Sequence, residues 1–160
     1  VVAAIELAKS MQRPLKIVGP IFDSTYFEEQ VKPQLNEDIQ YVSHATQTQL
    51  KRLAADASVF LATATWEEPF GLATLEMLAC GLPVVGFESA IPPELRRARA
   101  SIAVPSASWS DLLEPVLQAE SFDPASCRAF AEQFDMRNTA EAYAELYGEI
   151  IRKSLVKDHG

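Results

Sequence analysis

The chain has 160 residues, 48% of them hydrophobic, which suffices for one domain with a core of its own. It carries 14 Lys and Arg against 22 Asp and Glu, and the resulting formal charge of −8 disfavours nucleic acid as a partner. No run approaches the roughly 18 apolar residues of a membrane-spanning helix.

Helices and strands are predicted to alternate along the first part of the chain. An apolar period of about 3.6 residues indicates helices, and short β-branched or aromatic runs indicate strands. Helices are expected at residues 1–11, 26–35 and 46–57, and strands at residues 15–18, 39–42 and 58–62. This alternation predicts an α/β domain with a doubly wound parallel sheet.

The loop at residues 63–68 follows a strand and is therefore expected on the ligand-binding side of such a sheet. His44 lies in another loop, and histidine is a residue type that often serves as a general base. The polar residues around it favour a surface or helix-capping role instead. Trp66 is expected either to shape a pocket or to pack beneath its loop.

The most informative segment is Glu68-Pro-Phe-Gly-Leu-Ala-Thr-Leu-Glu76, which holds two carboxylates with seven residues between them. From Pro69 to Phe87 the only formal charge is that of Glu76, and the other residues of this run are typical of a core. An ionised carboxylate is costly to bury unless donors satisfy it. We therefore expect Glu76 to lie in apolar surroundings and to take its donors from a ligand.

The helix of this segment is expected to begin at Gly71. The free amides of Phe70, Gly71 and Leu72 would then form a helix N-terminus, whose N–H groups and dipole suit a phosphate. Because glycine lacks a Cβ, a ligand can approach it closely. Alanine in its place is expected to leave the fold unharmed, provided that the glycine does not have a positive φ. The alternative is a capped core helix with Glu76 emerging at the surface.

Further elements are predicted beyond the motif. Gly81 and Pro83 are expected to end its helix. Strands are predicted at residues 84–87 and 101–104, and helices from residue 108 to 157 with breaks near Pro124 and Asp135. The last helix, about residues 138–157, carries an apolar stripe. The cluster Arg96, Arg97 and Arg99 is interpreted as a solvated face rather than a phosphate-steering patch.

The string EEPFGLATLEMLACGLPVVGFES, followed by Pro93-Glu94, closely resembles the donor-site signature of retaining glycosyltransferases with the GT-B fold. The resemblance is to the large family 4 group, glycosyl transferases group 1, with its Glu-x7-Glu motif. Weaker resemblance extends from KIVGP to AYAELYGEI. It implies that residues 1–160 are a single Rossmann-like domain, the donor-binding half of a GT-B enzyme, truncated at its N-terminus with the first Rossmann-like domain absent.

The resemblance also implies roles for residues of the motif. Glu68 would contact hydroxyls of the transferred sugar and orient it without acting as a nucleophile. Glu76 would bind the ribose hydroxyls. The backbone amides of Phe70, Gly71 and Leu72 would bind the sugar and the diphosphate.

By the same resemblance, two turns of the first half would reach the donor. Gly19, in the turn Gly19-Pro20, would lie near the diphosphate, although Gly-Pro after a strand is also a common turn sequence with no binding role. Tyr41 and Val42 would contact the nucleobase, but Ser43 stands where relatives often have glycine.

The implied reaction transfers a sugar from a nucleoside diphosphate sugar with retention at the anomeric carbon, without a cofactor or a divalent metal. The implied partners are the nucleotide sugar and an N-terminal acceptor domain of the same full-length chain, through which any membrane association would run. The family's upstream Arg and Lys, which neutralise the diphosphate, have no counterpart in this sequence, so the 160-residue chain alone is expected to be inactive. Cys80 and Cys127 are expected to be reduced thiols, which predicts a cytoplasmic protein.

Two other functions fit parts of the sequence. Paired carboxylates also serve glycoside hydrolases, but a glutamate within an apolar helix disfavours that class. A non-catalytic nucleotide-sugar-binding or protein-interaction module could share the scaffold. This alternative draws support from residues 88–94, where Ala90 and Ile91 replace the small, flexible residues of relatives.

Overall fold

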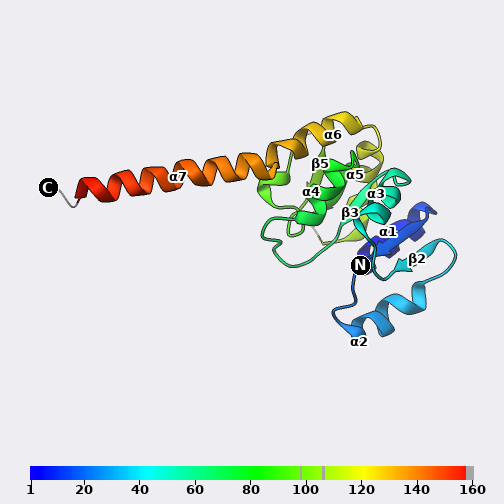
Figure 1. The fold of residues 1–160 in the computed structure, drawn as a ribbon. Helices are drawn as coiled ribbons and strands as arrows, with labels where there is room; N and C mark the ends of the chain where they lie inside the picture. Colours follow the sequence, from blue (N-terminus) through cyan, green and yellow to red (C-terminus); the bar gives the residue numbers. More distant parts are fainter. Residues whose placement is uncertain (98, 106, 158–160) are drawn as a thin grey trace.

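The computed structural model describes residues 1–97, 99–105 and 107–157 (Figure 1). The first elements are α1 (Val2–Met11), β1 (Leu15–Val18), α2 (Ser24–Tyr26), β2 (Ile39–Val42), α3 (Gln47–Ala55) and β3 (Phe60–Ala62). They are followed by α4 (Leu72–Ala79), β4 (Val84–Phe87), β5 (Ser101–Val104), α5 (Leu113–Ala119), α6 (Pro124–Ala131) and α7 (Met136–Lys157). Short 3-10 turns lie at Lys32–Gln34, Pro93–Leu95, Trp109–Leu112 and Glu132–Phe134.

The strands form two parallel sheets. In one, β1 pairs with β2, with Leu15 opposite Ile39 and Val18 opposite Val42. The other has the order β3-β4-β5. Its central strand β4 is buried along its whole length, as its β-branched sequence predicts for a parallel strand covered on both faces.

Alternate residues of β4 point into two separate core clusters. Val84 packs with Met77 and Leu78 of α4 and with residues of α6. Val85 packs on the opposite face with Leu7 of α1 and with residues of α5. The period of two along the strand thus places helices on both faces of the sheet, which is the predicted α/β, doubly wound arrangement.

The predicted bounds of β1, β2, β4 and β5 agree with the structure, but the expected helix at residues 26–35 is wrong. That segment divides into α2, a π-helical turn at Phe27–Val31 and the 3-10 turn at Lys32–Gln34. Pro33 offers no backbone N–H, and its ring clashes with the carbonyl four residues earlier, so a regular helix cannot pass through it. The strand expected at residues 58–62 begins only at Phe60.

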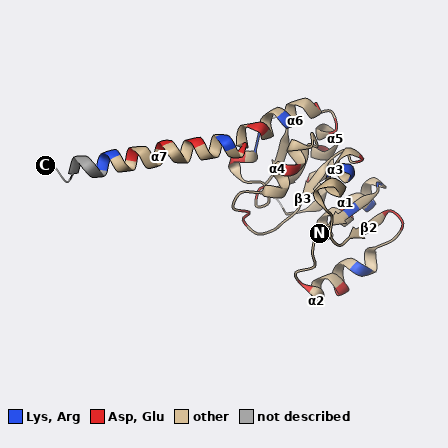
Figure 2. Ribbon diagram, viewed as in Figure 1, with Lys and Arg blue, Asp and Glu red and all other residues tan. Residues whose placement is uncertain are grey.

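Helix α7 has 22 residues and projects away from the rest of the chain (Figure 1). Acidic and basic residues are interspersed along it (Figure 2). Its large exposed apolar side chains are Met136, Tyr143, Leu146, Tyr147, Ile150 and Ile151. Within the described ranges, none of the helices combines the length and apolar character needed to cross a bilayer.

Candidate functional site

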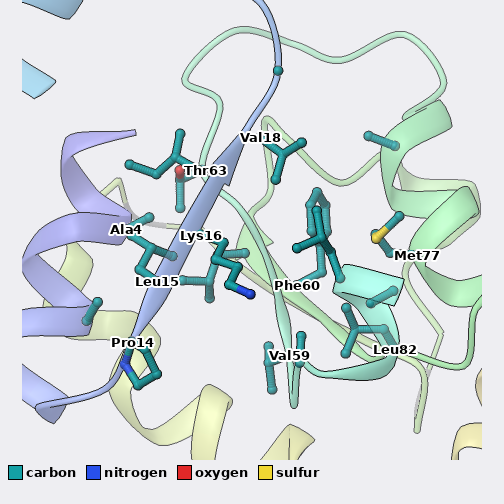
Figure 3. A pocket seen from close by; sticks show the side chains of 18 of the residues that line it. Ala4, Pro14, Leu15, Lys16, Val18, Val59, Phe60, Thr63, Met77 and Leu82 are labelled. Atoms are coloured by element: carbon teal, nitrogen blue, oxygen red, sulfur yellow. The ribbon is translucent and has the colours of Figure 1, made fainter. Parts of the chain in front are cut away.

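The candidate site lies where β1 and β3 end, at the boundary between the two sheets. A cavity of about 880 Å³ lies between β1 and β3 along their length, and Gly19, His44, Thr63 and Glu76 belong to its wall. Figure 3 shows side chains of β1 and of the β3 segment lining it. Open α/β sheets bind ligands outside the carboxyl ends of strands, at the point where strand order reverses. The position therefore agrees with a ligand site at this edge.

Glu68 is held in place by the loop at residues 88–91. Its backbone N–H donates to the carbonyl of Ser89 at 2.8 Å, and the Ser89 hydroxyl donates to the carbonyl of Ala64 at 2.8 Å. The indole N–H of Trp66 donates to a carboxylate oxygen of Glu68 at 3.3 Å. Trp66 is 66% exposed, so it does not pack beneath the loop. Glu68 itself is half-buried and keeps acceptor capacity for a further donor.

Glu76 is exposed, which corrects the prediction that it lies in apolar surroundings. Helix α4 turns Thr74, Met77 and Leu78 to the core and Glu76 to the outside. The side-chain amide of Gln47 donates to Glu76 Oε1 at 3.3 Å. A ligand is therefore not needed to offset burial of this carboxylate, and the group is accessible at the cavity wall.

Gly71 is the N-cap of α4, so the helix begins one residue later than predicted. Its φ of 77° lies in the left-handed region that favours glycine. A Cβ there would lie 3.1 Å from Pro92 Cδ and 3.3 Å from Leu95 Cδ1. The condition on which alanine was expected to leave the fold unharmed is therefore not met, because the backbone conformation favours glycine and a Cβ would also crowd Pro92 and Leu95.

The first amides of α4 receive no side-chain cap, because Gly71 has no side chain to offer. Donors at this helix end are thus left for another acceptor. On either side of Gly71 lie two exposed apolar side chains, Phe70 at 40% and Leu72 at 66%. The Phe70 ring meets the edge of Phe134, with ring centroids 6.1 Å apart.

The three predicted residues of the first sheet lie together at its carboxyl edge. The Tyr41 hydroxyl donates to the Gly19 carbonyl at 2.7 Å, and the Gly19 N–H donates to the Val42 carbonyl at 3.2 Å. Gly19 reaches the cavity wall, whereas Tyr41 and Val42 belong to the neighbouring strand β2. The structure thus brings Gly19 and Glu76 to one cavity, with Glu68, Phe70 and Leu72 on the segment that leads into α4.

Arg96 is a residue that the sequence interpretation missed. Instead of forming a solvated face, it is half-buried, and it donates from Nε to the Ile91 carbonyl at 2.8 Å and from Nη2 to the Glu88 carbonyl at 2.7 Å. It therefore fixes the loop whose Ser89 carbonyl holds Glu68. The sequence does not distinguish Arg96 from Arg97. The difference arises in the fold, where Arg96 follows the turn at Pro93–Leu95 and its side chain lies against the loop at residues 88–91.

His44 is exposed beside the cavity and does not cap α3. That helix is capped by Thr46, which forms a capping box with Gln49. The loop residues Ala90 and Ile91, which depart from the family pattern, are 4% and 0% exposed. They contribute to the core beneath the loop.

Among curated proteins, the chain is similar to a D-inositol 3-phosphate glycosyltransferase of Streptomyces bingchenggensis, with 30% identity over 126 residues. The match covers 74% of this chain and 27% of that protein. The solved structure of Anabaena HepE in complex with UDP and glucose has a TM-score of 0.75 at 19% identity, covering 92% of this chain and 43% of that one.

A glycosyltransferase of Rickettsia africae has a TM-score of 0.79 at 15% identity, covering 94% of this chain and 44% of that one. The chain thus spans less than half the length of each of these relatives. Its fold is that of one Rossmann-like half of a GT-B glycosyltransferase. The sequence family described as glycosyl transferases group 1 matches residues 1–120. The chain therefore belongs to the glycosyl transferases group 1 family.

Proposed function

We propose that this chain is the donor-binding half of a retaining, family 4 glycosyltransferase that transfers a sugar from a nucleoside diphosphate sugar. The observation that carries the proposal is the placement of two accessible carboxylates, Glu68 and Glu76, on either side of the uncapped N-terminus of α4. This arrangement offers acceptors for hydroxyls at both ends and donors for anionic oxygens between them. Structural neighbours bound to UDP and UDP-glucose support this ligand class.

In the proposed complex, Glu76 accepts hydrogen bonds from the ribose hydroxyls. The amides of Phe70, Gly71 and Leu72 bind the diphosphate and the sugar, and they stabilise the leaving diphosphate as its charge develops. Glu68, positioned by Ser89 and Trp66, accepts from a hydroxyl of the sugar and orients the ring. The Gly19 turn and the ends of β2 at Tyr41 and Val42 then lie on the nucleotide side.

The whole enzyme requires more than this chain. We propose that an acceptor domain of the same protein completes the cleft, that no divalent metal or cofactor takes part, and that the enzyme is cytoplasmic. The 160-residue chain alone is expected not to transfer sugar. The altered loop at residues 88–94 gives little support to a non-catalytic module, because its departures have a structural role: Ala90 and Ile91 fill the core.

Calorimetric titration of the full-length protein with UDP, GDP and ADP, and with their glucose conjugates, tests the proposal. Glu76→Ala should weaken the binding of nucleotide and nucleotide sugar alike by about 10-fold or more, since a hydrogen bond to a charged group contributes about 1.5–3 kcal/mol. Glu68→Ala should weaken only the sugar conjugates. Glu67→Ala, at an exposed neighbour, serves as the control. Equal losses for bare nucleotide and conjugate in Glu68→Ala would contradict the assigned roles.

A further inference from the structure

The two tryptophans of the chain, Trp66 and Trp109, have different surroundings. Trp109 is partly buried and packs against the core cluster that contains Leu112 and Val116. Trp66 is 66% exposed, belongs to none of the core clusters formed by the described residues, and takes part in none of their ring contacts. Packing within the described part of the chain therefore does not account for this large apolar side chain.

The loop that carries Trp66 is anchored on both sides of this residue. The Ser89 hydroxyl donates to the carbonyl of Ala64 at 2.8 Å, and the Ser89 carbonyl accepts from the N–H of Glu68 at 2.8 Å. Because both anchors belong to one residue, residues 65–67 form a short exposed excursion with Trp66 at its centre. The backbone is thus held in place before a ligand arrives, which lowers the entropy that binding would cost.

The indole N–H of Trp66 points to the carboxylate that is proposed to hold the transferred sugar. It donates to Glu68 Oε2 at 3.3 Å. A single exposed apolar side chain is ordinary on a protein surface and needs no ligand to explain it. Trp66 differs because its only polar group is engaged by Glu68, which orients the ring and leaves its two faces free of hydrogen-bonding groups.

The shared carboxylate places Trp66 next to that sugar. A hydroxyl donates to a carboxylate at about 2.7 Å, so a hydroxyl oxygen bonded to Glu68 Oε2 would lie within about 6 Å of Trp66 Nε1. A pyranose carries hydroxyls at its rim and C–H groups on its faces. The rim needs hydrogen-bond partners such as Glu68, and the C–H groups match the partly negative face of an aromatic ring. Together the two side chains offer both kinds of contact that a sugar ring makes.

We propose that Trp66 determines specificity for the transferred sugar: its ring packs on a C–H face of a pyranose while Glu68 accepts from a hydroxyl at the rim. This inference rests on the proposed function, because it takes Glu68 as the acceptor for that hydroxyl. It goes further by assigning to Trp66 a share of the affinity that distinguishes a sugar nucleotide from the bare nucleotide. The nucleotide itself, bound at α4 and the Gly19 turn, gains nothing from this ring.

Calorimetric titration of two variants of the full-length protein tests the proposal. Trp66→Leu removes the ring and the N–H, whereas Trp66→Phe removes the N–H but keeps a flat ring, so the difference between them measures the ring. The probes are the glucose conjugate of UDP, GDP or ADP that the parent binds most tightly, and its bare nucleotide. Trp66→Leu should weaken binding of the conjugate by about 10-fold, as expected for about 50 Å² of covered ring surface, and Trp66→Phe by less than about 3-fold. Neither variant should change the affinity for the bare nucleotide.

Tryptophan fluorescence of the full-length protein gives a second readout. The conjugate should shield Trp66 from the quencher acrylamide, and the bare nucleotide should not. Trp66→Phe removes the emission of this residue, so the shielding by the conjugate should be absent from that variant, whatever other tryptophans contribute. Because Trp66 is exposed, both variants should retain the Tm of the parent.

Equal losses of affinity in Trp66→Leu and Trp66→Phe would overturn the proposal, because the N–H alone would then account for the effect. Unchanged binding of the conjugate by Trp66→Leu would also overturn it, and a lower Tm of that variant would assign the ring to packing against another part of the protein. If Glu68→Ala still weakens only the conjugate, the proposed function stands and the role of Trp66 fails alone. If the parent binds none of the nucleotides or conjugates, the proposed function itself fails.

Discussion

Gly71 has a conformational role in the fold, besides the ligand contacts proposed for its amide. Its positive φ and the 3.1 Å approach of Pro92 Cδ predict that Gly71→Ala destabilises the protein by about 1–2 kcal/mol. Gly148→Ala is the control, because nothing lies within 4 Å of the added Cβ and alanine is the better helix former. Thermal unfolding should show a lower Tm for the first variant and an unchanged or higher Tm for the second. Equal Tm values for Gly71→Ala and the parent would contradict this assignment.

Arg96 is expected to affect donor binding without touching the donor. Arg96→Lys keeps the positive charge, but an ammonium group lacks the planar fork that lets arginine donate to both loop carbonyls. The loop at residues 88–91 should then become less ordered, and Glu68 should no longer be held in position. We expect the affinity for a sugar nucleotide to fall severalfold while that for the bare nucleotide is retained. Arg97→Lys, at an exposed side chain, should change neither affinity. Calorimetry on both variants checks this, and parallel losses for both ligands would point to a general loss of folding instead.

At the scale of elements, α6 carries a pH-dependent cap. The Asp123 carboxylate accepts from the amides of Ala125 and Ser126, each at 3.1 Å, and these bonds, the one from Ala125 foremost, lower the pKa of Asp123. A lowered pKa in the folded state means that the ionised cap contributes its full stability above the unfolded pKa of about 4. That contribution is lost as pH falls through the folded pKa.

Asp123→Asn should therefore be less stable than the parent at pH 7, and the difference should shrink near pH 3. Urea unfolding at both pH values measures it. Ser126→Ala removes the hydroxyl that donates to the Asp123 carboxylate at 3.0 Å. Because one cause of the lowered pKa of Asp123 is then gone, the stability of Ser126→Ala should depend less on pH than that of the parent. If the difference in free energy of unfolding between the parent and Asp123→Asn is the same at both pH values, the charge of Asp123 does not contribute to stability.

The elements that sequence predicted well are those whose pattern is local. The bounds of β4 follow from a β-branched run after Gly81 and Pro83, whatever packs against it. Burial of Glu76 was predicted wrongly because the exposed face of α4 also carries Leu72 and Ala73, so hydrophobicity does not reveal which face points inward. The positive φ of Gly71 and the return of Arg96 onto its loop depend on contacts between distant segments, which no local pattern encodes.

At the scale of the whole molecule, α7 presents an apolar stripe that no described residue covers. Leu146 and Ile150 are 49% and 54% exposed and lie one helical turn apart. Replacing both with Lys should leave the Tm of the 160-residue chain unchanged, because exposed substitutions usually alter stability by no more than about 0.5 kcal/mol. In the full-length protein the same pair should lower the Tm, because we expect the acceptor domain to pack on this stripe. Glu145→Lys, on the same helix, controls for the added charge. An unchanged Tm in both proteins would show that the stripe stays uncovered and that α7 takes no part in joining the two domains.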